Sequence, residues 1–82
     1  MTKYYYTYVL YSNKFERLYI GQTDNIQRRY EQHQKGKVES TKPYLPYKII
    51  HIETFGTRVE SVNREKELKK TKGRKFLKSL IS

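Results

Sequence analysis

The chain has no cysteine and no tryptophan among its 82 residues, and only one methionine, two prolines and four glycines. Without cysteine there can be no disulfide bond, no thiolate metal site and no cysteine nucleophile. No apolar run approaches the length of a membrane span, and the N-terminus lacks the apolar core of a secretory signal. The length and these absences predict a single domain over residues 1–82 in a soluble, cytoplasmic protein.

Acidic residues are also scarce. Eight Asp and Glu stand against eighteen Lys and Arg, which gives a formal net charge of +10. Such an excess on a short chain attracts polyanions. Nine tyrosines add flat side chains, which serve as stacking surfaces but also as ordinary strand and core material. The composition favours nucleic acid over an acidic protein or a membrane surface, with a merely solubilising basic surface as the plain alternative.

Aromatic and β-branched segments near the N-terminus predict a β-hairpin. Residues 3–11 and 17–21 have the composition of strands, joined by a turn centred on residues 13–14. This turn would place Tyr8 directly opposite Tyr19. Alternation along the strands predicts an aliphatic face and a tyrosine face, made respectively of Thr7, Val9, Leu18 and Ile20, and of Tyr6, Tyr8, Tyr19 and Gly21.

A helix is predicted after the hairpin, capped near Thr23 or Asp24 and stopped at Gly36. A basic loop with two prolines follows over residues 37–46. Residues 47–55 then predict a third strand, whose three isoleucines suit a central position in a sheet.

The C-terminal third predicts two further helices. Residues 57–60 have the form of a capping box, so a helix should start there and run to about residue 70. Gly73 is expected to separate it from a short last helix. The resulting order is strand, strand, helix, strand, helix, helix. This order predicts an α+β fold with a small three-stranded, mainly antiparallel sheet flanked by helices.

Two pairs of side chains are candidates for chemistry. Tyr8 and Tyr19 share one face of the hairpin, where they form either part of a site or a stabilising cross-strand aromatic pair. Arg29 and His33 lie four residues apart on the helix face that also carries Ile26. A cation on that face needs a partner or a ligand, unless it reaches solvent at the edge. Arginine could bind two phosphate oxygens at once, which lysine does less well.

Glu65 is the candidate metal ligand. Its carboxylate could bind Mg²⁺, which often takes one or two carboxylates together with substrate phosphate. Alternatively, it forms an ion pair with Lys69 one helical turn further on. A second group of residues is expected either to contact a nucleic-acid backbone or to form only a solvated basic surface: Lys35, Lys37, Lys42, Lys48 and Tyr44.

The joint pattern resembles the GIY-YIG nuclease superfamily. Residues 6–8 (Tyr-Thr-Tyr) and 19–21 (Tyr-Ile-Gly) look like its two paired motifs, at a similar separation. Arg29, ten residues after the second motif begins, and His33 also stand at spacings similar to those of the family. One position departs from the pattern, because Tyr6 stands where the first motif has glycine.

The C-terminal half extends the resemblance. Residues 64–69 resemble the helix that carries the metal ligand in this superfamily, with Glu65 in the place of the glutamate. The likeness spans residue 4 to about residue 81. It is greatest for small single-domain members that are similar to the N-terminal domain of the bacterial excinuclease C subunit.

The resemblance implies a metal-dependent endonuclease that hydrolyses phosphodiester bonds, with DNA expected rather than RNA. In this family pattern Tyr8 would be the general base, helped by His33, while Arg29 would stabilise charge on the phosphate. Tyr19 would orient the water or the phosphate, and Glu65 would bind Mg²⁺ or Mn²⁺. A monomer or weak homodimer is expected, with a protein partner for targeting. The alternatives are a non-catalytic or partner-dependent nucleic-acid-binding module on the same fold, and a basic protein-interaction module.

Overall fold

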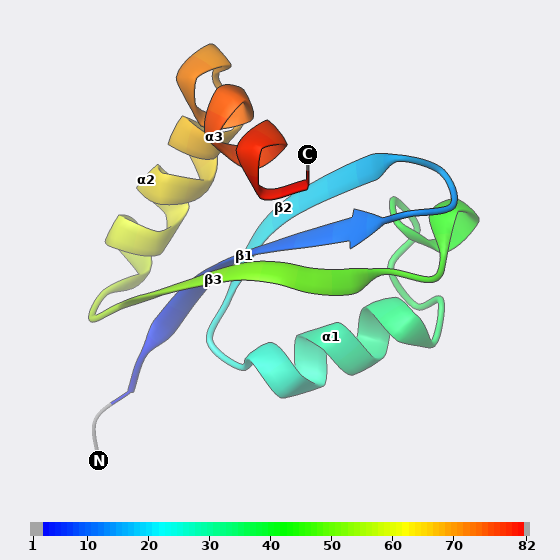
Figure 1. The fold of residues 1–82 in the computed structure, drawn as a ribbon. Helices are drawn as coiled ribbons and strands as arrows, with labels where there is room; N and C mark the ends of the chain where they lie inside the picture. The colour runs from blue at the N-terminus through cyan, green and yellow to red at the C-terminus, as the bar shows by residue number, and fades with distance from the viewer. Residues whose placement is uncertain (1–2, 82) are drawn as a thin grey trace.

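The computed structural model describes residues 3–81 as one sheet with helices on both faces (Figure 1). Its elements, in chain order, are β1 (Tyr5–Ser12), β2 (Arg17–Thr23), α1 (Ile26–Gln34), the 3₁₀-helix η1 (Lys42–Tyr44), β3 (Lys48–Phe55), α2 (Arg58–Leu68) and α3 (Thr71–Ile81). This order confirms the predicted α+β fold. Within the described residues, none of the helices has the length and apolar character needed to cross a membrane.

The strand order is β2-β1-β3, and both pairings are antiparallel. The expectation that the isoleucine-rich third strand is central was wrong, because β1 is central and β3 is an edge. The burial of the two strands explains the difference. Four consecutive residues of β1, from Thr7 to Leu10, are buried, whereas Ile52 of β3 is 42% exposed. A strand buries several consecutive residues only when both faces of the sheet are covered and a neighbouring strand lies along each of its edges.

The sheet separates two small cores. On one face, Tyr8 and Leu10 pack with side chains of α1 and of the loop that follows it. On the other face, Val9 packs with Leu68 of α2 and Leu77 of α3. Figure 1 shows α1 on one side of the sheet and α2 with α3 on the opposite side. Alternation along β1 therefore points its side chains into the two cores in turn.

The hairpin register differs from the prediction by two residues. Tyr8 lies opposite Gly21, not opposite Tyr19. The strands are joined by four residues, 13–16, and Glu16 takes a left-handed backbone conformation with φ of 53°. Because side chains alternate with a period of two, a shift of two residues exchanges partners but leaves both predicted faces unchanged.

The first helix is capped by Asn25, which corrects the expected cap at Thr23 or Asp24. The Asn25 side chain accepts a hydrogen bond from the backbone N–H of Arg28, at 3.0 Å. Thr23 still belongs to β2, and its hydroxyl accepts from the backbone N–H of Asn25 at 3.1 Å. The chain leaves the helix through Gly36, whose φ of 73° suits glycine and agrees with the predicted stop.

The predicted start of α2 is confirmed, because the Thr57 hydroxyl accepts from the backbone N–H of Glu60 at 3.3 Å. The Glu60 carboxylate accepts from the same hydroxyl at 2.9 Å, rather than from the backbone N–H of Thr57 as in a full capping box. The interpretation of Gly73 as a separator was wrong. Gly73 lies within α3, and a Cβ there would overlap the carbonyl oxygen of Glu67 and the backbone of Leu68. The glycine allows α3 to approach the end of α2 closely.

Candidate active site

The site begins where the ring of Tyr8 lies across β2. A Cβ built on Gly21 would lie 2.6 Å from the Tyr8 Oη, 2.7 Å from its Cζ and 2.9 Å from Cε1 of Tyr19. Tyr8 is only 3% exposed. Because Gly21 has no side chain, the Tyr8 ring can lie directly over β2, and this position determines where its hydroxyl lies.

A chain of hydrogen bonds leads away from that hydroxyl. Tyr8 Oη lies 2.9 Å from His33 Nε2, and His33 Nδ1 lies 2.8 Å from Thr41 Oγ1. The Thr41 hydroxyl donates its proton to the Val38 carbonyl at 3.3 Å. Thr41 must therefore accept from His33 Nδ1–H, which leaves Nε2 as the acceptor for the Tyr8 hydroxyl. The chain holds His33 in one tautomer and orients the Tyr8 proton toward it.

Burial keeps both members of this chain uncharged near neutral pH. Desolvation raises the pKa of Tyr8 to about 12, although the nearby Arg29 acts in the opposite direction. Desolvation also lowers the pKa of His33 to about 4, and the positive charge of Arg29 adds to that effect. His33 is fully buried. It is therefore a neutral imidazole with a free lone pair directed at a neutral phenol.

Tyr19 and Arg29 complete the cluster. The Tyr19 ring centroid lies 4.9 Å from that of His33 and 6.2 Å from that of Tyr8. Interaction with the Tyr8 hydroxyl raises the pKa of the Arg29 guanidinium, which also donates to Gln32 Oε1 at 3.1 Å. The structure therefore brings together the four side chains predicted for catalysis: Tyr8, Tyr19, Arg29 and His33.

This cluster lies beside a polar hollow, and Arg29 is a member of the cluster that also lines the hollow. The other residues that line the hollow come from the end of β2, from the turn that follows it, from α1 and from the first residue of α2; they are Gln22, Thr23, Asp24, Arg28, Gln32 and Arg58. A buried tyrosine–histidine pair next to an arginine-lined hollow is suited to bind an anion and to move a proton beside it.

Residues 4–78 match the family of GIY-YIG catalytic domains. The chain belongs to the GIY-YIG family. It is 34% identical over 70 residues to a UPF0213 protein of Haloquadratum walsbyi, covering 84% of this chain and 78% of that protein. It is 39% identical over 70 residues to a UPF0213 protein of Bacillus licheniformis, covering 84% and 71% respectively.

A solved structure agrees with this assignment. The solution NMR structure of a UPF0213 protein from Bacillus halodurans is similar to this one with a TM-score of 0.56 and 28% sequence identity. The match covers 94% of this chain and 84% of that chain. The GIY-YIG family is a family of nucleases, so the chain has a nuclease-type domain in general terms.

The two GIY-YIG motifs lie side by side on β1 and β2. Tyr6, in the place of the first motif's glycine, pairs with Thr23 and is half-buried on the same face as Tyr8. Its side chain lies along the strand from the cluster and leaves the Tyr8–His33 hydrogen bond intact.

The candidate metal ligand lies apart from this cluster. Glu65 belongs to α2, which packs on the sheet face opposite α1 (Figure 1). Its side chain is 22% exposed, and its carboxylate pairs with Lys69 at 2.7 Å, as the alternative interpretation expected. Within residues 3–81 there is no group of three or more His, Cys, Asp or Glu side chains that could hold a metal ion. A metal here would depend on the Glu65 carboxylate together with water and substrate oxygens, a ligand set that Mg²⁺ accepts.

The predicted basic surface lies at the far end of α1 and beyond it. Its four lysines are exposed, and none of them forms an ion pair within the described part of the chain: Lys35, Lys37, Lys42 and Lys48. Tyr44 is half-buried, because the guanidinium of Arg17 stacks over its ring at 4.1 Å and Phe15 lies against it. The lysines are free to contact phosphates, whereas one face of Tyr44 is already occupied.

Sequence reasoning missed Thr41. Its side chain is fully buried and fixes the His33 tautomer, yet it lies in a loop where no periodic pattern marks buried positions. Its position before Lys42-Pro43 was an available signal, since threonine commonly precedes a short helix with proline in its first turn.

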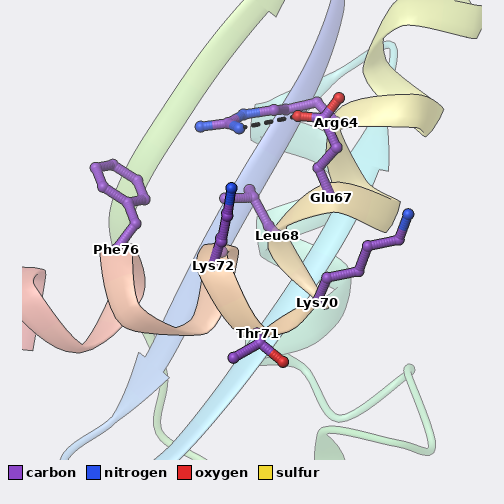
Figure 2. A pocket seen from close by; sticks show the side chains of 8 residues that line it. Arg64, Glu67, Leu68, Lys70, Thr71, Lys72 and Phe76 are labelled. Carbon is purple, nitrogen blue, oxygen red and sulfur yellow. Dashed lines mark hydrogen bonds and ion pairs between the residues drawn. The ribbon is translucent and has the colours of Figure 1, made fainter.

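A second hollow lies at the junction of α2 and α3 (Figure 2). Its lining includes Leu68 and Phe76, and Arg64 there is bound to Glu67 at 3.2 Å and to Glu53 at 2.9 Å. None of the residues predicted for the site lines this hollow. Lys70 and Lys72 also line it, whereas its arginine is already paired with two carboxylates.

Proposed function

We propose that the protein is a metal-dependent endonuclease that hydrolyses phosphodiester bonds in nucleic acid, with DNA as the preferred substrate. The observation that carries this proposal is the chain from Tyr8 through His33 to Thr41, placed beside Arg29. These hydrogen-bonded side chains are buried and can accept a proton, and the neighbouring guanidinium can bind a phosphate. Such an arrangement fits hydrolysis of a phosphodiester better than binding alone.

Tyr8 acts as the general base in this proposal. With a pKa of about 12 it is a neutral phenol, so it cannot start as a phenolate near pH 7. It accepts a proton from the attacking water while its own proton passes to Nε2 of His33, 2.9 Å away. The proton then resides on His33, whose Nδ1–H remains bonded to Thr41. The water oxygen bonds to phosphorus as the bond from phosphorus to the leaving alcohol oxygen breaks, and the leaving oxygen takes its proton from solvent. Bond making at phosphorus and proton transfer from Tyr8 to His33 thus proceed together.

The substrate itself would make His33 a better base. Arg29 lowers the pKa of His33, in addition to the larger effect of burial. A phosphate bound to Arg29 brings negative charge that offsets the guanidinium. The pKa of His33 then rises when substrate is present. Arg29 has two roles in this proposal, because it also stabilises charge on the phosphate in the transition state.

In this proposal Glu65 would hold Mg²⁺ or Mn²⁺ through its carboxylate, which in this structure lies on α2, apart from the Tyr8 cluster. When bound, the metal would neutralise charge on the scissile phosphate and on the leaving oxygen. Lys69 must release the carboxylate for this to happen. Their ion pair is exposed on the lysine side, so it stabilises the helix only weakly and is readily exchanged. Tyr19, whose ring lies against His33, would orient the water or the phosphate through its hydroxyl.

The exposed lysines at positions 35, 37, 42 and 48 would gather the substrate by contacting its backbone. Contacts of this kind release counterions from nucleic acid. If five to eight phosphates are neutralised, affinity should fall steeply with salt, by roughly three orders of magnitude or more between 50 and 200 mM. An affinity that does not change with salt would contradict a phosphate-binding surface.

The test is a cleavage assay on labelled single-stranded, duplex, flap and branched DNA and on RNA, with Mg²⁺ or Mn²⁺. The variants are Tyr8→Phe, Arg29→Ala and Glu65→Ala, with Tyr4→Phe at an exposed tyrosine as the matched control. We expect cleavage by the wild type and the control, and a loss of at least about a hundredfold in rate for the three site variants. Cleavage by Tyr8→Phe at the wild-type rate would overturn the assigned base.

The second candidate is a binding module that needs a partner for turnover or has lost it. Two observations favour it: Tyr6 replaces the motif glycine, and Glu65 is bound to Lys69 rather than to the tyrosine cluster. In that case the wild type binds nucleic acid with strong salt dependence and never cuts it. Addition of a targeting partner, or formation of a weak homodimer at high protein concentration, should then restore cleavage.

A further inference from the structure

The polar hollow beside the tyrosine cluster contains more positively charged side chains than carboxylates. Among the described residues that line it, Asp24 is the only carboxylate, and three cations surround it: Lys3 at 3.1 Å, Arg28 at 3.4 Å and Arg58 at 3.8 Å. Arg29 lines the same hollow and pairs with no carboxylate in the described part of the chain. Four cations around one carboxylate leave an excess of three positive charges, which a polyanion would relieve.

Arg58 is held in place to an unusual degree for an arginine whose side chain is 51% exposed. Its guanidinium donates to Gln22 Oε1 at 3.2 Å and lies over the ring of Tyr5, 4.9 Å from the centroid. Exposed arginines normally remain mobile, because ordering them costs side-chain entropy. Here β1, β2 and α2 together fix one guanidinium at the rim of the hollow, so it is oriented before any ligand arrives.

Stability of α2 does not account for an arginine at this position. Arg58 is the first residue of the helix, where the helix dipole disfavours a cation and favours an anion. The first turn of α2 does contain Glu60, but the first turn of α1 contains no acidic residue, and Arg28 and Arg29 lie at the start of that helix. Arginines therefore stand at the start of both helices, where they are unfavourable for the helices themselves, and all three line the same hollow.

We propose that this hollow binds the phosphodiester group next to the scissile one on the same strand, with Arg58 as its principal ligand. The inference rests on the proposed function, since it deepens the contact between this site and its nucleic-acid substrate. Arg29 lies between the hollow and the Tyr8 hydroxyl, so it contacts the scissile phosphate while Arg58 contacts its neighbour. The two contacts together orient the strand along the β2 edge and fix which bond faces Tyr8.

The experiment measures binding of a short labelled DNA strand by fluorescence anisotropy, with Ca²⁺ in place of Mg²⁺, over a series of salt concentrations. Arg58→Ala is compared with wild type, with Arg58→Lys, and with Arg74→Ala, an exposed arginine of α3 that loses the same charge. Inorganic phosphate is titrated as competitor. Thermal unfolding of every variant shows that the fold is kept.

We expect Arg58→Ala to bind about tenfold more weakly, as the loss of one charge-assisted phosphate contact implies. The slope of log affinity against log salt should become shallower by about one. Arg58→Lys should keep that slope and lose part of the affinity, because lysine keeps the charge but not the two-pronged contact. Arg74→Ala should change affinity less than Arg58→Ala does.

Equal affinity and equal slope for Arg58→Ala and wild type would overturn the inference, and so would an equal loss in Arg74→Ala. Competition by millimolar inorganic phosphate that is the same for wild type and Arg58→Ala would also contradict it. The wild type decides the proposed function separately. If it binds but never cuts, the endonuclease proposal fails, while the ratio between Arg58→Ala and wild type still decides this inference. If it binds no nucleic acid, both fail.

Discussion

Replacement of Gly21 by alanine tests the geometry of the site at its closest contact. The new Cβ would lie 2.6 Å from Tyr8 Oη and 2.7 Å from Cζ. Ordinary contacts begin near 3.4 Å, so the Tyr8 ring must move by about 0.8 Å. The second neighbour, Cε1 of Tyr19 at 2.9 Å, blocks one direction of escape. Overpacking of this kind costs about 1–3 kcal/mol of unfolding free energy.

The same shift should disturb the chemistry more than the fold. Tyr8 Oη is the atom that meets His33 Nε2 at 2.9 Å, and a displacement near 1 Å breaks that hydrogen bond. Misplacement by about 1 Å typically lowers turnover about a hundredfold. We expect Gly21→Ala to unfold at lower urea concentration and to cut nucleic acid about a hundredfold more slowly, with affinity for the substrate nearly unchanged.

Gly56→Ala is the matched control, because nothing lies within 4 Å of a Cβ built on Gly56. It makes the same chemical change at an open position. We expect no loss of stability there, and a gain of about 0.4–1 kcal/mol if the loss of freedom in the unfolded chain dominates. Should Gly21→Ala be as stable as Gly56→Ala, the close approach of Tyr8 to β2 would be refuted.

Three further predictions follow from the buried polar chain and from helix packing. Thr41→Val leaves the His33 Nδ1–H without an acceptor and should lower the unfolding free energy by about 1–3 kcal/mol in urea, whereas Thr41→Ser should keep most of it. His33 has a pKa of about 4 when folded and 6.5 when unfolded, so the unfolded state binds the proton first as pH falls. The contribution of His33 to the free energy of unfolding should therefore be fully present above pH 6.5 and fall by about 3 kcal/mol as the pH is lowered to 4. His33→Gln should lack this decline, and an identical decline in His33→Gln would contradict the prediction. Gly73→Ala would place a methyl group in the backbone of α2 and should cost about 1–3 kcal/mol, read from the urea midpoint; an unchanged midpoint would show that α2 and α3 pack less closely.

The hairpin shows how far sequence alone specified this fold. Alternation with a period of two predicted both faces of β1 and β2, since every second side chain must share an environment. The register depended on the loop, and a four-residue connection with Glu16 in a left-handed conformation is not marked by any glycine. The pairing of Tyr8 with Tyr19 was therefore wrong by two residues, although both rings lie in the same cluster.

Glycines and loop residues account for most of what sequence reasoning missed. Gly73 has the pattern of a helix break, yet it serves close packing between α2 and α3, and only the third dimension distinguishes the two roles. Thr41 is buried because the loop after α1 folds back onto that helix, and such a contact has no periodic signal in the sequence. By contrast, Arg29 and His33 were predictable as neighbours, because residues four apart share a helix face.

The role of Arg58 could not be predicted from the sequence for a different reason. It begins a helix on the opposite face of the sheet from α1, so no spacing along the chain relates it to Arg28 or Arg29. Its convergence on the same hollow depends on where the ends of β2 and α2 meet in space.

In the proposed mechanism, Tyr8 moves a proton to His33 during phosphodiester hydrolysis. The most direct measurement is the single-turnover cleavage rate of Tyr8→Phe relative to Tyr4→Phe, at saturating protein and with affinity measured in parallel. We expect a loss of about a hundredfold to ten-thousandfold in rate for Tyr8→Phe with affinity retained, and a wild-type rate for Tyr4→Phe. Equal rates for the two variants would contradict it, because the hydroxyl at the centre of the hydrogen-bonded chain would then take no part in the reaction.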